Sequence, residues 1–154
     1  MKPKAILMTL PILLVAAVMC FAQNPQIGTW KLNDSKSKIP AGAPKNHTVL
    51  YEVAGDSTKV TVDGVDGSGG TTHSEWTGKF DGKDYPVTGD ATADTRSYTL
   101  LNARSLSFSN KKAGKVTLSG RIVVSKDGKT RTVTTTATDS KGKKVTSVAV
   151  YDKQ

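Results

Sequence analysis

The chain has 154 residues, a single cysteine and a formal net charge of +9. A chain of this length forms one domain that buries roughly two-thirds of its unfolded surface, and a single cysteine excludes an internal disulfide framework. The excess of basic residues suits an anionic partner. However, no aromatic residues alternate with the lysines as a nucleic-acid stacking surface requires, so we predict no nucleic-acid partner.

The first residues of the chain are arranged like an export signal. Two lysines precede an apolar run over residues 6–18, and a Cys-Phe-Ala sequence then provides a small-x-small cleavage site before Gln23. The apolar run is shorter than the roughly 20 residues that a membrane span needs. We predict a signal peptide over residues 1–22 and one domain over residues 23–154, exported to the periplasm or the extracellular space and not membrane-spanning.

Cys20 raises an alternative, a lipoprotein whose cysteine is acylated after cleavage. That processing favours a small residue directly before the cysteine, and Met19 does not fit. We therefore expect export without a lipid anchor, after which the domain has no cysteine. Removal of the signal also removes two lysines and no acid, which lowers the net charge to about +7.

From Ile27 onward, short runs rich in valine and threonine alternate with turn residues. β-branched side chains favour strands, and Asp-Gly between two such runs is a strong hairpin signal because the turn needs a positive φ. Turns recur about 9–15 residues apart, as in a sandwich or a barrel. The predicted strands cover residues 27–33, 46–54, 57–64, 71–80, 83–87, 94–101, 104–110, 114–125, 129–138 and 142–151.

No segment has a convincing helical period, so we predict an all-β domain with no substantial helix. Consecutive antiparallel strands joined by short turns form an up-and-down meander, and closure is the arrangement that removes both exposed edges. The sequence therefore predicts an antiparallel up-and-down β-barrel of nine or ten strands. A two-sheet sandwich is the alternative.

The alternation of apolar and polar residues predicts which side chains face inward. Val116, Leu118, Ile122 and Val124 share one face of a strand, and Arg121 lies on the other face. The threonines at every second position of residues 130–138 predict a stripe that faces solvent. The expected interior comprises Trp30, Val49, Tyr51, Val60, Val62, Trp76, Phe80, Leu100, Phe108, Leu118, Ile122 and Val148.

The first predicted strand begins with Gly28-Thr29-Trp30, and a Gly-x-Trp at this position resembles the lipocalins and their wider calycin relatives. The resemblance implies that Trp30 closes one end of the barrel and packs against an arginine from a late strand, for which Arg121 and Arg131 are candidates. A guanidinium stacked on an indole gains about 0.5–2 kcal/mol. The combination of GTWKLN, DGKDYPVTGD and a terminal VYDK also resembles a family of uncharacterised exported bacterial proteins.

The closing segment SVAVYDKQ is similar to the last strand of the intracellular fatty-acid-binding proteins. The arginine that would hold a fatty-acid carboxylate, two residues before Tyr151, is replaced by Ala149. Residues 34–45, where that family has a helical lid, contain two prolines and predict an extended loop. The resemblance therefore implies the fold and leaves the ligand open.

The sequence contains no catalytic signature, and we predict that the protein is not an enzyme. The exported domain has no cysteine nucleophile and no Gly-x-Ser-x-Gly elbow. His73 and Glu75 share one strand face, but a zinc site needs three or four ligands. Asp63 and Asp66 lie in a glycine-rich loop without the distal glutamate of a calcium loop. We therefore predict no metal and no cofactor.

Two functions remain open for the barrel. In the first, it binds a small apolar or amphipathic ligand whose acid group would pair with Arg96, Arg121 or Arg131, and Tyr51 and Tyr85 would line the site. Tyr85 is expected at the rim, where it would either plug the core or gate a cavity. In the second, the barrel is filled and the protein is a structural or interaction protein of the cell envelope. An aromatic content of only 6% slightly favours a cavity.

Overall fold

The computed structural model describes residues 24–138 and 141–154, so the predicted signal peptide and Cys20 lie outside the described residues. The described chain forms ten strands and a single turn of 3-10 helix, η1 (Asp34–Lys36). The strands are β1 (Gly28–Leu32), β2 (Lys45–Ala54), β3 (Ser57–Val65), β4 (Thr71–Gly78), β5 (Tyr85–Thr88), β6 (Thr95–Asn102), β7 (Ser105–Lys112), β8 (Lys115–Val124), β9 (Thr130–Thr138) and β10 (Lys144–Lys153).

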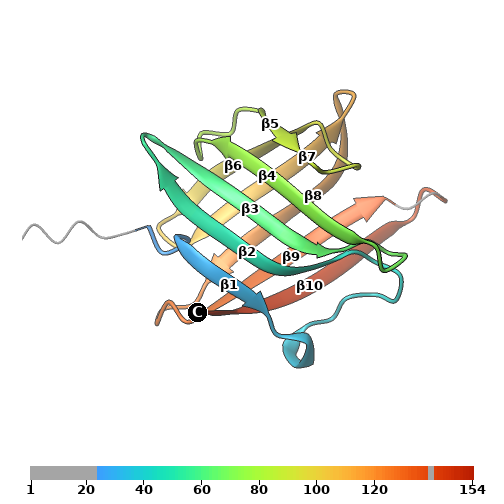
Figure 1. The fold of residues 1–154 in the computed structure, drawn as a ribbon, viewed down its shortest axis with the longest axis horizontal. Coiled ribbons are helices and arrows are strands. Elements are labelled where there is room, and N and C mark those ends of the chain that lie inside the picture. The colour runs from blue at the N-terminus through green and yellow to red at the C-terminus, as the bar shows by residue number, and fades with distance from the viewer. Residues whose placement is uncertain (1–23, 139–140) are drawn as a thin grey trace, which may run out of the picture.

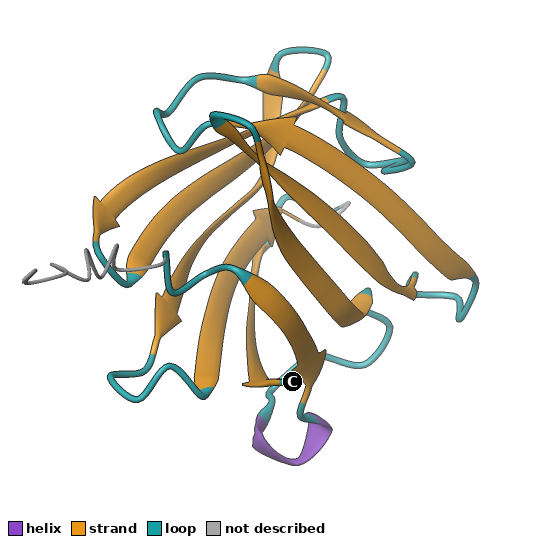
Figure 2. Ribbon diagram, turned by 60° about the vertical axis from the view of Figure 1, so that its left-hand side comes forward, coloured by secondary structure: helices purple, strands orange, loops and turns teal. Residues whose placement is uncertain are grey.

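The strands form a closed antiparallel barrel in which each strand pairs with its neighbours in the chain (Figure 1). Closure is made by β1, which pairs with β2 on one side and with β10 on the other. Figure 2 shows the strands enclosing a common interior, with connections at both ends. The prediction of an all-β, up-and-down barrel is therefore confirmed, with ten strands, and the sandwich alternative is wrong.

The two ends of the barrel carry different connections, because successive turns of a meander alternate between its ends. One end holds the β2–β3, β4–β5, β6–β7 and β8–β9 turns together with the C-terminus. The last residue is fixed there, since the backbone N–H of Gln154 donates to Thr29 O at 3.0 Å. The opposite end holds the β1–β2, β3–β4, β5–β6, β7–β8 and β9–β10 connections.

The end that holds the C-terminus is filled by aromatic side chains, and we call it the aromatic end. Its buried members are Trp30, Tyr51, Trp76, Tyr98 and Tyr151. The Trp76 and Tyr98 rings meet edge to face with centroids 4.8 Å apart, a favoured aromatic geometry. Phe80 stacks on Trp76 with ring centroids 6.4 Å apart and meets Tyr98 edge to face at 5.7 Å. These ring contacts join the aromatic end into one packed cluster.

Three residues expected in the interior lie elsewhere. Leu100 is 51% exposed and Val116 is 59% exposed. Val116 faces solvent because the β7–β8 register shifts between Asn110 and Lys111, and one extra residue reverses the alternation on β8. Leu100 lies next to the corresponding shift in the β6–β7 register, at the rim of the barrel. Val148 pairs with Thr134 and with Lys38 and faces away from the interior, although it is half-buried.

The β1–β2 connection, predicted as an extended loop, contains η1 and a turn that the Ala43 N–H closes by donating to Pro40 O at 3.1 Å, with extended chain between them. After η1 the chain returns to the edge of β10, where Lys38 and Val148 exchange two backbone hydrogen bonds of 2.7 and 2.9 Å. The pairing on this edge of β10 ends there, and residues 39–44 then cross to the start of β2. In the described part of the chain, no helix has the length and apolar character needed to cross a membrane.

Candidate ligand-binding site

The Gly-x-Trp motif occupies the aromatic end of the barrel. Gly28 has a φ of +123°, a backbone conformation that residues with a side chain rarely adopt, so a substitution there would be strained. Trp30 is fully buried, and its indole Nε1 donates a hydrogen bond of 2.8 Å to Gln26 O. The chain that precedes β1 is thereby held across this end of the barrel.

Arg131 is the arginine that packs on Trp30. Its guanidinium carbon lies 5.1 Å from the Trp30 ring centre, 4.9 Å from that of Tyr51 and 5.0 Å from that of Tyr151. Arg131 is only 2% exposed, and neither Nε nor Nη1 has a hydrogen-bond partner among the described residues. Three ring faces therefore surround a buried positive charge that no carboxylate balances.

Arg96 also faces inward, but its charge is balanced. Its Nε donates to Asn110 Oδ1 at 2.7 Å, and its Nη2 lies 3.2 Å from Asp90 Oδ2. Nearby, the hydroxyl of Tyr51 donates to that of Tyr98 at 3.4 Å, and burial raises the pKa of the Tyr51 phenol far above its usual range. Arg96 therefore belongs to a buried polar network that needs no further acceptor.

Tyr85 takes the first of the two roles considered for it. Its ring packs edge to face on Trp76 with centroids 5.8 Å apart, and its hydroxyl donates to Asp81 Oδ2 at 3.0 Å. The side chain thus caps the aromatic end from the first residue of β5. It lies at the end of the barrel opposite to the mouth pocket described below.

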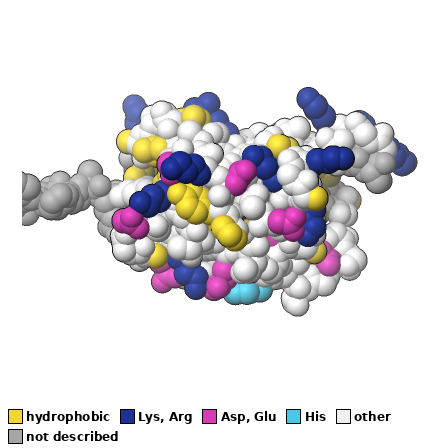
Figure 3. Space-filling view, turned by 90° about the horizontal axis from the view of Figure 1, so that it is seen from above, with side chains coloured by type: hydrophobic (Ala, Val, Ile, Leu, Met, Phe, Trp, Pro, Cys, Tyr) yellow, Lys and Arg dark blue, Asp and Glu magenta, His cyan; other side chains and the backbone are white. Residues whose placement is uncertain are grey.

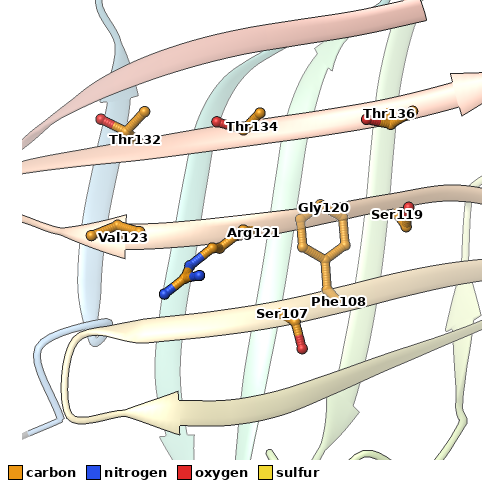
Figure 4. Close-up of a pocket in the computed structure, with 9 residues that line it drawn as sticks. All are labelled: Ser107, Phe108, Ser119, Gly120, Arg121, Val123, Thr132, Thr134 and Thr136. Carbon is orange, nitrogen blue, oxygen red and sulfur yellow. The ribbon is translucent and has the colours of Figure 1, made fainter. Parts of the chain in front are cut away.

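Arg121 faces solvent, on the outer surface of the barrel. It lies in the middle of β8, with Ser107 of β7 and Thr134 of β9 as its cross-strand partners (Figure 4). These residues line a shallow outer groove of about 510 Å³, which also includes the outward threonines of β9. The predicted solvent-facing threonine stripe is therefore confirmed, and the structure separates Arg121 from the two inward arginines.

The inward face of β9 and β10 is lined by small side chains, which we call the small-residue wall. Its members are Val133, Thr135, Ala137, Val145, Ser147 and Ala149. They pair across the two strands as successive rungs: Ala137 with Val145, Thr135 with Ser147, and Val133 with Ala149. All six are half-buried, although they face the barrel interior. The next rung is the pair Arg131 and Tyr151. The wall therefore ends at the guanidinium.

A pocket of about 290 Å³ lies at the other end of this wall, and we call it the mouth pocket. Ala137 and Val145, the outermost rung, form one side of it, and residues 41–43 of the β1–β2 connection form the other. It coincides with the stretch of β10 beyond Val148, where pairing on the second edge has ended. The mouth pocket thus opens beside a stretch of β10 that has no strand partner on its second edge.

The remaining sequence candidates form surface clusters. His73 Nδ1 lies 2.7 Å from Asp63 Oδ1 and its Nε2 lies 3.9 Å from Glu75 Oε1, while Glu75 pairs with Lys59 at 2.7 Å. Asp66 accepts three hydrogen bonds within its own hairpin, from Ser68 and Gly70. In residues 24–138 and 141–154, no three His, Cys, Asp or Glu side chains are arranged to hold a metal ion.

Charged side chains of both signs are interspersed on the face shown in Figure 3, and an imidazole lies beside acidic side chains. Exposed ion pairs of 2.5–3.9 Å occur on the barrel surface, and pairs of this kind contribute little to stability. The surface in this view shows no concentrated patch of one charge.

Sequence reasoning missed the small-residue wall and the mouth pocket. The wall had a signal, since residues 133, 135, 137, 145, 147 and 149 carry small side chains at the inward positions of two neighbouring strands. The mouth pocket had none, because it depends on the path of residues 39–44 across the barrel.

Comparisons with known proteins add no identification: no protein-family model matches the chain, and no curated protein matches it.

Proposed function

We propose that the barrel binds one small apolar or amphipathic molecule, which enters at the mouth pocket and lies along the small-residue wall. The observation that carries this proposal is the half-exposure of side chains that face the interior, from Ala137 and Val145 to Val133 and Ala149. In a filled barrel, side chains at such positions would be as fully buried as those of the aromatic end.

The length of the wall suits an extended chain. From Ala137 to Arg131 is six residues of one strand, which corresponds to about 20 Å at the usual rise of a strand. Each methylene removed from water contributes about 0.8 kcal/mol before the costs of association are subtracted. A straight chain of about ten carbons would therefore supply enough free energy for specific binding.

The sequence supports the cellular setting of this proposal. The export signal over residues 1–22 would place the domain in the periplasm or outside the cell, without an anchor at Cys20. The Gly28-x-Trp30 motif with Arg131 stacked on the indole supports a lipocalin-like, calycin type of barrel. We propose a non-enzymatic carrier, which needs no cofactor and uses the interior of the barrel.

A second candidate function is interaction with an acidic partner through the outer groove at Arg121. Residues 95–126 contain seven basic residues and no acidic one. Arg121 has no hydrogen bond or ion pair among the described residues, and hydroxyl side chains flank it on both sides. These observations favour the alternative of an envelope interaction protein.

Binding of dodecanol tests the carrier proposal, because the alcohol carries a chain of suitable length and no charge. Ser147→Phe fills the middle of the small-residue wall and should weaken binding at least 10-fold, measured by titration calorimetry. Thr146→Phe is the matched control, since Thr146 is exposed on the outer face of the same strand. The carrier proposal is wrong if the unmodified protein does not bind the alcohol, or if both variants bind it equally well.

A further inference from the structure

We propose that the aromatic end of the barrel docks on an anionic lipid surface through the β6–β7 and β8–β9 turns. This inference goes beyond the carrier function and does not depend on a ligand inside the barrel. The contact would be peripheral, with apolar side chains in the headgroup layer and no segment across the membrane. The residues that would make it, which we call the docking corner, are Leu100, Leu101, Arg104, Val123, Lys126 and Lys129.

The distribution of exposed apolar side chains is the first reason. In the described part of the chain, the large apolar residues that are exposed are Val53, Leu100, Leu101, Val116 and Val123. All but Val116 lie within the last three residues of a strand that ends at the aromatic end, namely β2, β6 or β8. Single exposed apolar side chains need no explanation, but their concentration at one end of a molecule indicates a contact surface.

The charge of the docking corner is the second reason. Residues 95–126 contain seven basic residues and no acidic one. Arg104 lies in the β6–β7 turn, and Lys126 and Lys129 lie in the β8–β9 turn. The one acidic residue of these two turns is Asp127, whose Oδ1 accepts a hydrogen bond of 3.0 Å from the Lys129 backbone N–H. Basic residues therefore outnumber acidic ones at this corner, which suits anionic lipid headgroups.

The two turns belong to one continuous surface, which is the third reason. The backbone N–H of Val124 donates to Arg104 O at 2.9 Å, and Arg104 Nη1 donates to Val124 O at 3.3 Å. Ser105, the first residue of β7, pairs with Val123 on one side and with the end of β6 on the other. Leucines and basic side chains at the end of the barrel suit a bilayer, whose interface accepts apolar side chains without a preformed cleft.

Docking at this end would leave the mouth pocket accessible. The pocket lies at the opposite end of the barrel, between the outermost rung of β9 and β10 and residues 41–43. The export signal predicted over residues 1–22 would bring the domain to a compartment that is bordered by membranes. A carrier docked in this way would face the solution with its mouth.

The test is sedimentation of the protein with vesicles at pH 7. One kind of vesicle contains phosphatidylglycerol and phosphatidylcholine in equal parts, and the other contains phosphatidylcholine alone. We expect the unmodified protein to bind the anionic vesicles at least about 10-fold more tightly, because several basic residues would lie near the surface. This preference should decline as NaCl is added, since salt screens the attraction.

Two matched pairs of variants locate the contact. Leu101→Ser should weaken binding to the anionic vesicles about 5-fold or more, because an apolar side chain no longer enters the interface. Val116→Ser removes an apolar side chain of similar exposure from the opposite end and should have no effect. Lys126→Glu should likewise weaken binding, whereas Lys115→Glu makes the same change of charge at an exposed position of the opposite end and should weaken it much less.

The outcomes separate this inference from the carrier function. Equal affinity for the two kinds of vesicle overturns the inference, and failure to bind either kind overturns it in favour of an acidic protein as partner. Equal losses in Leu101→Ser and Val116→Ser, or in Lys126→Glu and Lys115→Glu, would also overturn it, because the contact would not lie at the aromatic end. None of these results bears on the carrier function, which is measured with dodecanol, and Leu101→Ser should bind dodecanol as tightly as the unmodified protein does.

Discussion

The two ends of β9 and β10 differ in how they use the same barrel. At one end, Arg131 and Tyr151 are buried against Trp30. Six residues away along the same strands, Ala137 and Val145 are half-buried and line the mouth pocket. The pairing is regular throughout, so the difference comes from the side chains and from the chain segments that cover each end. A single pair of strands can thus supply stability at one end and accessible space at the other.

This difference separates the residues that stabilise the fold from those whose small side chains leave space inside the barrel. Deleting atoms at the aromatic end should create cavities in a close-packed region, and adding atoms there should force rings apart. Along the small-residue wall, added atoms should meet open space. Substitutions that delete atoms at the aromatic end and substitutions that add atoms along the small-residue wall therefore test the comparison directly.

The largest effect is expected for Trp30→Ala. Removing a fully buried indole should lower the free energy of unfolding by about 3–5 kcal/mol, as large aromatic deletions in cores do. That loss is a large fraction of the 5–15 kcal/mol typical of a whole domain. Urea denaturation measures it, with Val53→Ala as the control, since Val53 is 68% exposed. Equal midpoints for the two variants would show that the aromatic end does not hold the barrel.

A smaller loss of stability is expected when atoms are added to the aromatic end. A Cβ at Gly78 would lie 2.5 Å from the Tyr85 ring and 2.6 Å from the Trp76 ring. Gly78→Ala should therefore cost about 1–3 kcal/mol, as overpacking does. Ala149→Val adds two carbons to the small-residue wall and should cost less than about 1 kcal/mol, because Ala149 is only half-buried. If Ala149→Val were the more costly variant in denaturation experiments, the wall would be packed like the rest of the core.

Alkaline pH should act on the aromatic end through its tyrosines. Burial raises the pKa of the Tyr151 phenol above the value of about 10 in the unfolded chain. The contribution of Tyr151 to the free energy of unfolding is complete below about pH 10. It declines above that pH, because the unfolded chain then releases a proton that the folded protein retains. The decline approaches about 1.4 kcal/mol per pH unit for one group. Denaturation at pH 9, 10 and 11 should show a shallower decline for Tyr151→Phe, and an unchanged slope would refute this burial effect.

The turns and the strand alternation made most of the fold predictable from the sequence. Nearly every predicted strand has its counterpart within a few residues, because the turn residues between the runs mark the hairpins. Alternation failed at Val116, where a bulge adds a residue that no local pattern marks. Bulges depend on how two distant strands meet, and this information is absent from a single run of sequence.

The candidate site was predictable in part. The Gly-x-Trp motif alone did not distinguish Arg121 from Arg131 as the partner of Trp30. The alternation of side chains does: Arg121 adjoins the inward Ile122 and so points outward, whereas Arg131 lies between outward threonines and so points inward. Applied to both strands, this reasoning selects Arg131, as the structure does. The mouth pocket was not predictable, because it depends on the course of residues 39–44 after the edge pairing of Lys38 has ended.

The most direct test of a ligand along the small-residue wall is a methyl NMR experiment with dodecanoic acid that carries a nitroxide spin label on its chain. The account predicts paramagnetic broadening of the methyl signals of Ala137, Val145 and Ala149, which line the wall, and sharp signals for the exposed Val116 and Val123. Broadening confined to Val123, which lines the outer groove, with sharp signals along the wall, would contradict it.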